Sequence, residues 1–130
     1  MGKRKTFELP GLDHGATPIP LASQVGNVFR TSGVMGRDPA TGVLAEDGAT
    51  QVAQVFANVE ALLRVAGLGL ERIVFLEVLL ADDALRGEIN KHWLAWFPDP
   101  GDRPARHTTV RALPPGFLVQ LLVEAVAGDA

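Results

Sequence analysis

The most regular hydrophobic pattern in the sequence runs from about Gly48 to Ala66. Apolar residues recur there three and four positions apart, which is the spacing of one face of an α-helix. Asp47 is a residue type that caps helix N-termini, and Gly67 is one that ends helices. The pattern predicts an amphipathic helix whose buried face consists of Val52, Val55, Phe56, Val59, Leu62, Leu63 and Ala66.

The residues that follow predict a strand and then a second helix. Ile73–Leu80 is apolar except for Glu77, and apolar residues on both faces of a strand indicate cover on both sides. Asp82 or Asp83 can cap a helix that ends before Pro98. The apolar stripe of this helix, which we expect to pack in the core, contains Leu85, Ile89, Trp93, Trp96 and Phe97.

Shorter segments predict the remaining strands: Lys3–Leu9 at an edge, Val25–Thr31, a hairpin around Asp38–Gly42, Arg106–Ala112 and Phe117–Ala127. The order β-β-β-α-β-α-β-β predicts a single α+β domain over residues 1–130. We expect a mixed sheet of about six strands with two helices on one face. The last strand is apolar on both faces, and a monomer would expose one of them, so the sequence also predicts self-association.

Composition and charge exclude several classes of function. The sequence has no cysteine, which excludes a disulfide framework, a catalytic thiolate and a cysteine-ligated zinc site. Its formal net charge of −3 argues against nucleic acid as the main ligand. Met1–Pro10 lacks the apolar segment of a signal peptide, and no apolar run is long enough to span a bilayer. We expect a soluble, cytoplasmic protein without a cofactor or a metal ion.

One residue stands out as candidate chemistry. No nucleotide-binding, zinc-protease or serine-hydrolase motif is present, and the three histidines lie on different predicted elements. Arg106, in contrast, lies at the entry to a strand that should be buried, and its planar guanidinium can hold a carboxylate through two hydrogen bonds. Two interpretations stay open. Arg106 binds a carboxylate ligand, or it forms an internal ion pair with Glu124 or Glu77.

Arg106 also belongs to a set of short motifs. The most specific is Arg103-Pro104-Ala105-Arg106, followed by Leu113-Pro114 and a closing apolar strand. The others are Ser32-Gly33 after a strand, the turn Asp38-Pro39-Ala40-Thr41-Gly42, Asn58 in the first helix, Ala66-Gly67 at its end, and Asn90 ahead of Trp96-Phe97-Pro98. Together, over roughly residues 18–127, these motifs resemble the reactive-intermediate deaminase (Rid, or YjgF-type) family.

The resemblance implies a chorismate-mutase-like fold that assembles as a homotrimer, with a central barrel of sheets and ligand clefts between subunits. It also implies hydrolysis of small 2-imino acids and their enamine tautomers to 2-keto acids and ammonia. In this interpretation Arg106 holds the substrate carboxylate and the backbone of Gly33 assists it. The other positions that the resemblance places at the substrate are Ser32, Ile19, Asn90 and Thr108, although Asn90 can equally cap a neighbouring segment.

Two positions depart from the family pattern. Ile19 stands in place of a tyrosine, and Gln120 stands where a glutamate positions or protonates water. An amide cannot exchange a proton at accessible pH, so a general acid–base contribution is in question. His14, in the loop before the second strand, has a side chain suited to proton transfer and can compensate, unless it is simply a solvated loop residue.

Three interpretations of function follow from these residues. The first is an imine or enamine deaminase with Arg106, Gln120 and His14 in its catalytic site. The second is a module that binds small carboxylates at Arg106 without turnover, which the replacement by Gln120 favours. The third is RNA cleavage or translation inhibition, against which the acidic charge and the lack of tyrosine argue.

Overall fold

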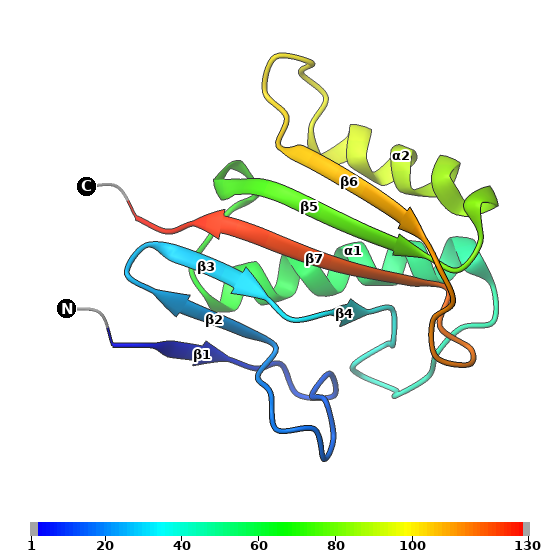
Figure 1. The fold of residues 1–130 in the computed structure, drawn as a ribbon, viewed down its shortest axis with the longest axis horizontal. Coiled ribbons are helices and arrows are strands. Elements are labelled where there is room, and N and C mark those ends of the chain that lie inside the picture. The colour runs from blue at the N-terminus through cyan, green and yellow to red at the C-terminus, as the bar shows by residue number, and fades with distance from the viewer. Residues whose placement is uncertain (1–2, 129–130) are drawn as a thin grey trace.

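The computed structural model describes residues 3–128, which form one mixed sheet and two helices (Figure 1). The helices are α1 (Gly48–Val65) and α2 (Arg86–Trp96), and two short 3₁₀ turns are η1 (Leu70–Arg72) and η2 (Asp83–Leu85). The strands are β1 (Lys5–Phe7), β2 (Ala22–Val25), β3 (Val28–Thr31), β4 (Val34–Met35), β5 (Ile73–Leu80), β6 (Ala105–Val110) and β7 (Val119–Val126).

Strand β7 is central in the sheet, whose order is β1-β2-β3-β7-β5-β6 with β4 paired to β7. Of the described pairs, β5 and β6 are parallel and the others are antiparallel. The chain crosses from β5 to β6 through α2, as a parallel pair requires. Figure 1 shows both helices on the same side of the sheet. The predicted α+β class is confirmed, with seven strands rather than about six.

Helix α1 forms where the hydrophobic pattern predicted it. The Asp47 side chain caps the helix by accepting hydrogen bonds from the Thr50 hydroxyl at 2.7 Å and from the Thr50 backbone N–H at 2.9 Å. These two contacts, the hydroxyl first, hold the pKa of the Asp47 carboxyl below its usual value. Gly67 follows the helix with a φ of 76°, a conformation that glycine adopts without strain. The predicted apolar face packs on the sheet, and both Val52 and Val59 are fully buried.

The predicted single strand Val25–Thr31 is wrong. The chain reverses at Gly26 and Asn27, so that Val25 ends β2 and pairs with Val28 at the start of β3. Gly26 has a φ of 59°, and a glycine–asparagine pair is typical of two-residue hairpin turns. The turn is only two residues long and has a β-branched valine on each side, so the segment resembles one strand. The predicted turn at Asp38–Gly42 is present, closed by a 2.9 Å hydrogen bond from the Asp38 N–H to the Val43 carbonyl.

The face of the sheet opposite the helices carries apolar side chains that the described chain leaves uncovered. We call it the open face. Val28 and Val126 are 48% and 37% exposed there, although both would be buried in a two-sided core. The half-buried apolar side chains of this face are Phe75, Leu79 and Leu122. Self-association, which would cover this apolar surface, stays a prediction.

Two buried amides of α1 hold the loops that border the sheet. Gln51 is fully buried, donates from Nε2 to the carbonyls of Ala45 and Gly116, and accepts at Oε1 from the Leu118 N–H. Asn58 donates to the carbonyls of Met35 and Arg37 at 2.8 and 2.9 Å. The two side chains therefore fix the end of β4 with the residues after it, the segment before α1 and the segment before β7. The Asn58 motif of the sequence has this structural role.

We expect Gln51→Leu to lower the free energy of unfolding by at least about 2 kcal/mol, because each buried backbone group left unpaired costs about 1–3 kcal/mol. Urea unfolding measures this change. Gln24→Leu is the matched control, since the Gln24 amide donates only to the exposed Gly26 carbonyl, and we expect a loss of less than about 0.5 kcal/mol. Equal losses for the two variants would contradict the assigned role of Gln51.

Candidate functional site

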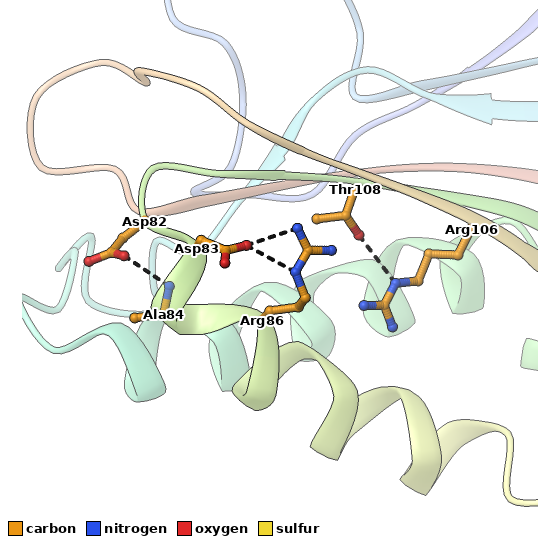
Figure 2. Close-up of polar contacts among 6 residues, drawn as sticks. All are labelled: Asp82, Asp83, Ala84, Arg86, Arg106 and Thr108. Atoms are coloured by element: carbon orange, nitrogen blue, oxygen red, sulfur yellow. Dashed lines mark hydrogen bonds and ion pairs between the residues drawn. The ribbon is translucent and has the colours of Figure 1, made fainter.

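Arg106 lies on the edge strand β6 and faces α2. Its partner in the parallel register is Leu76, a fully buried residue of the helix-covered face. The guanidinium carbon is 5.2 Å from the centre of the Trp93 ring on α2, and Nε donates a 3.3 Å hydrogen bond to the Thr108 hydroxyl (Figure 2). A cation over an aromatic face is a favourable contact that leaves its hydrogen-bonding edge available. We call Arg106, Thr108 and Trp93 the Arg106 group.

The Arg106 guanidinium has no carboxylate partner among residues 3–128. Neither proposed internal partner reaches it. Glu77 on β5 and Glu124 on β7 both project from the open face, whereas Arg106 projects from the opposite, helix-covered face. Burial lowers the pKa of Arg106, and the positive charge of Arg86 lowers it further. The group stays protonated nonetheless, since arginine does not lose its proton in proteins. A partly buried guanidinium without a carboxylate partner makes Arg106 a candidate residue for holding an anionic ligand.

A second set of candidate residues gathers near β4 and β7. The His14 Nε2 lies 3.2 Å from the Gly33 carbonyl oxygen. Because a carbonyl only accepts, Nε2 carries the hydrogen, and Nδ1 is left as an acceptor that is buried without a partner. A Cβ at Gly33 would collide with the Gln120 side chain, and the Gln120 amide contacts the Met35 sulfur at 3.6 Å. We call His14, Gly33, Met35 and Gln120 the Gly33 cluster.

A cavity of about 220 Å³ adjoins the Gly33 cluster. His14, Gly33 and Met35 line it, together with Arg37 and Phe117, and the Arg37 guanidinium lies 5.5 Å from the centre of the Phe117 ring. This volume accommodates a small metabolite or several waters. A larger cavity of about 510 Å³ lies between η1 and the end of α2, and neither Arg106 nor the Gly33 cluster lines it.

The remaining predicted positions differ in their surroundings. The Ser32 hydroxyl donates to the Pro20 carbonyl at 2.7 Å, so it is engaged in holding the loop before β2. Ile19 is 44% exposed. Asn90 is exposed on α2, four residues after Arg86 and three before Trp93, which places it on the same edge of the helix as both. Asn90 caps no neighbouring segment in residues 3–128.

One chain does not bring the Arg106 group and the Gly33 cluster together. In the register, Gln120 pairs with Leu79 of β5, and Leu79 pairs with Thr109 of β6. Strands β7 and β6 are therefore about 10 Å apart, with β5 between them. Gln120 also projects from the open face, whereas Arg106 projects from the helix-covered face. Within residues 3–128 the Arg106 group and the Gly33 cluster are therefore separate from each other.

The sequence pattern did not identify two neighbours of Arg106. Trp93 was expected to be core, and it does pack against Phe97 at 5.0 Å between ring centres, but it also supports the Arg106 guanidinium. Arg86 was not singled out at all. The spacing of Arg86 and Trp93, seven residues apart on one helix, is a signal that both lie on the same edge.

Other classes of site find no support in the described residues. In residues 3–128, no group of three or more histidine, aspartate or glutamate side chains could hold a metal ion. His92 stacks on Phe56, and His107 contacts the Thr109 hydroxyl on the open face. Neither helix of residues 3–128 is both long and apolar enough to cross a membrane.

Solved structures with this fold define the class of protein. RidA from the Antarctic bacterium Psychrobacter is 31% identical, superposes with a TM-score of 0.83, and the alignment covers 94% of this chain and 98% of that one. The YjgF gene product of Escherichia coli is 29% identical with a TM-score of 0.82 and the same coverage. The chain thus has the Rid fold, a mixed sheet backed by two helices.

Sequence relatives narrow this class to a family. The family described as Endoribonuclease L-PSP matches residues 18–127. A RutC family protein of Aquifex aeolicus is 36% identical over 110 residues, covering 84% of this chain and 88% of that protein. A 2-iminobutanoate/2-iminopropanoate deaminase of Mus musculus is 35% identical over 113 residues, with coverage of 85% and 82%. The chain belongs to the Endoribonuclease L-PSP family of Rid, or YjgF-type, proteins.

Proposed function

We propose that this protein hydrolyses small 2-imino carboxylic acids, and their enamine tautomers, to 2-keto acids and ammonia. The observation that carries the proposal is the Arg106 guanidinium, which is partly buried and has no carboxylate within ion-pair distance in the described residues. Relatives about 35% identical that are named 2-iminobutanoate/2-iminopropanoate deaminase support the same chemistry.

In the proposed reaction, the Arg106 guanidinium holds the substrate carboxylate through two parallel N–H···O hydrogen bonds. The Thr108 hydroxyl keeps the guanidinium in place. Water adds to the carbon of the C=N bond, and the C–N bond then breaks. The protonated imine and one water yield the 2-keto acid and an ammonium ion, so atoms and charge balance. The Gln120 amide orients the water beside the Gly33 backbone, and His14 accepts and returns the proton at Nδ1.

We also propose that the site is completed by a second copy of the chain in a homotrimer. Two observations support this assembly. The Arg106 group and the Gly33 cluster are separate half-sites in one chain, and the open face carries exposed apolar residues such as Val28 and Val126. An assembly that buries the open face of each copy can place Arg106 of one copy beside Gly33 of the next. The mass of the particle in solution, measured by light scattering, should be three times that of the chain.

A shared site predicts complementation between two defective variants. Arg106→Ala removes one half-site, and Gly33→Ala disturbs the other by displacing the Gln120 side chain. Each variant alone should lose at least about tenfold in activity, whereas co-expressed chains should regain parental activity at roughly a quarter of their sites, those where two intact halves meet. Ammonia release by the purified mixed assemblies measures this recovery. Activity no higher than that of the separate variants would contradict a shared site.

A specific observation favours a second function, which is carboxylate binding without turnover. Gln120 is an amide that contacts Met35 and cannot act as a general acid or base at accessible pH. Under this alternative the Arg106 group holds a 2-keto or related carboxylate as a ligand. RNA cleavage, which the family description names, is the third candidate, and the net charge of −3 argues against it.

One experiment separates the first two functions. An amino-acid oxidase generates 2-iminobutanoate in the presence of the protein, and ammonia release is followed above the spontaneous rate. Catalysis above that rate, reduced in Arg106→Ala, supports the deaminase. Calorimetric binding of 2-oxobutyrate without any rate enhancement would support the binding module and overturn the deaminase.

A further inference from the structure

A second arginine lies beside Arg106. Arg86 is the first residue of α2, and it shares an edge of that helix with Asn90 and Trp93. The Arg106 side chain extends along β6 from the Trp93 ring toward Thr108, which brings it toward the beginning of α2. Figure 2 shows the Arg86 and Arg106 guanidinium groups facing each other below Thr108. The two cations thus flank one stretch of surface between α2 and the edge of the sheet.

The charges around this surface are not balanced. The positive charge of Arg86 acts on Arg106 strongly enough to lower its pKa, in addition to the effect of burial. Arg86 forms one ion pair, with Asp83 at 2.9 Å, and no other carboxylate of residues 3–128 lies within ion-pair distance of either arginine. Two cations face one anion. A cation at a helix N-terminus is also unfavourable, because that end of the helix dipole is positive.

Asp83 orients Arg86 without using all of its hydrogen-bond donors. A single carboxylate oxygen, Oδ1, accepts from Arg86 Nε at 3.0 Å and from Nη2 at 2.9 Å. A guanidinium has five N–H donors, so Nη1 remains for another anion. The Arg86 side chain is 44% exposed, and a ligand can therefore reach it from solvent.

We propose that Arg86 selects substrates that carry a second carboxylate, so that the preferred substrates are short-chain 2-imino dicarboxylic acids. Arg106 holds the carboxylate next to the C=N carbon, and Arg86 holds the distal one through Nη1. This inference rests on the proposed deaminase function and specifies its substrate class. A second carboxylate gains a charge-assisted contact with the unused Nη1 donors of Arg86, and a monocarboxylate of similar length cannot make this contact.

Binding of the keto-acid products tests the inference independently of turnover. Calorimetry compares 2-oxoglutarate with 2-oxobutyrate on the parent protein and on Arg86→Gln. We expect Arg86→Gln to weaken 2-oxoglutarate at least about tenfold and 2-oxobutyrate less than about twofold, as a charge-assisted contact to one carboxylate requires. The matched control is Arg64→Gln on α1, which removes the same charge from another exposed intrahelical ion pair and should change neither affinity.

Turnover then separates this inference from the proposed function. An oxidase produces 2-iminoglutarate from glutamate and 2-iminobutanoate from 2-aminobutyrate, and we expect Arg86→Gln to raise KM for the first alone. Equal weakening of both ligands, or of neither, would overturn the role of Arg86 while leaving the deaminase intact. Hydrolysis of neither imine by the parent protein would overturn the deaminase, and the calorimetric comparison still decides whether Arg86 selects dicarboxylates.

Discussion

Replacing Arg106 with alanine is expected to lower kcat/KM for 2-iminobutanoate at least about tenfold. A charge-assisted hydrogen bond contributes about 1.5–3 kcal/mol, and each ~1.4 kcal/mol in transition-state binding corresponds to a factor of ten. The guanidinium can supply this energy because no carboxylate in residues 3–128 competes for it. Steady-state ammonia release, with imine supplied by an amino-acid oxidase, measures the change.

Two further variants identify the source of that loss. Arg106→Lys keeps the charge but removes the planar fork, so its kcat/KM should lie between those of the parent and of Arg106→Ala. Arg111→Ala removes an exposed arginine just beyond β6 and should leave kcat/KM unchanged. Urea unfolding of each variant shows whether the fold is retained. A folded Arg106→Ala protein with the kcat/KM of the parent would show that Arg106 does not bind the substrate carboxylate.

The hydrophobic pattern of the sequence predicted the bounds of those helices and strands that begin and end at recognisable cap or turn residues. Strand β5 has the predicted bounds Ile73–Leu80, and α1 ends within one residue of the predicted end. In both segments the period of apolar residues and the flanking cap or turn residues point to the same structure. The reversal at Gly26 was not predicted because only two residues separate Val25 from Val28, and valine is favoured in strands on either side of the turn.

The candidate site was predicted only in part, because its geometry depends on contacts between elements. Arg106 was identified from its residue type and its place at the start of a strand. That it faces Trp93 and Arg86 follows from how α2 crosses β6, and no local pattern encodes such a crossing. The separation of Gln120 from Arg106 follows from the register of β7 against β5. A change of one residue in that register would have moved Gln120 to the helix-covered face.

Gln120→Glu is expected to raise kcat for 2-iminobutanoate by about tenfold or more. A positioned acid–base group typically contributes 10²- to 10⁴-fold, and a carboxyl can exchange the proton that the amide cannot. Position 120 is suited to this role because its side chain packs against Gly33 in the half-site that would meet the C=N bond. The kcat of the variant is compared with that of Gln24→Glu, which adds the same charge on strand β2, separated from β7 by β3, and should leave kcat unchanged.

The outcome at position 120 also determines what His14 does. If Gln120→Glu raises kcat, then the proton transfer at Nδ1 of His14 is slower than transfer from a carboxyl at position 120, and His14→Gln in that background should cost little. If kcat does not rise, proton transfer by the residue at position 120 does not limit the reaction, and another residue transfers the proton. His14→Gln in the parent should then lower kcat by about 10²-fold, because Nδ1 is the buried acceptor that lacks a partner beside Gly33. No loss of kcat on His14→Gln in the parent protein would exclude His14 as the group that activates water.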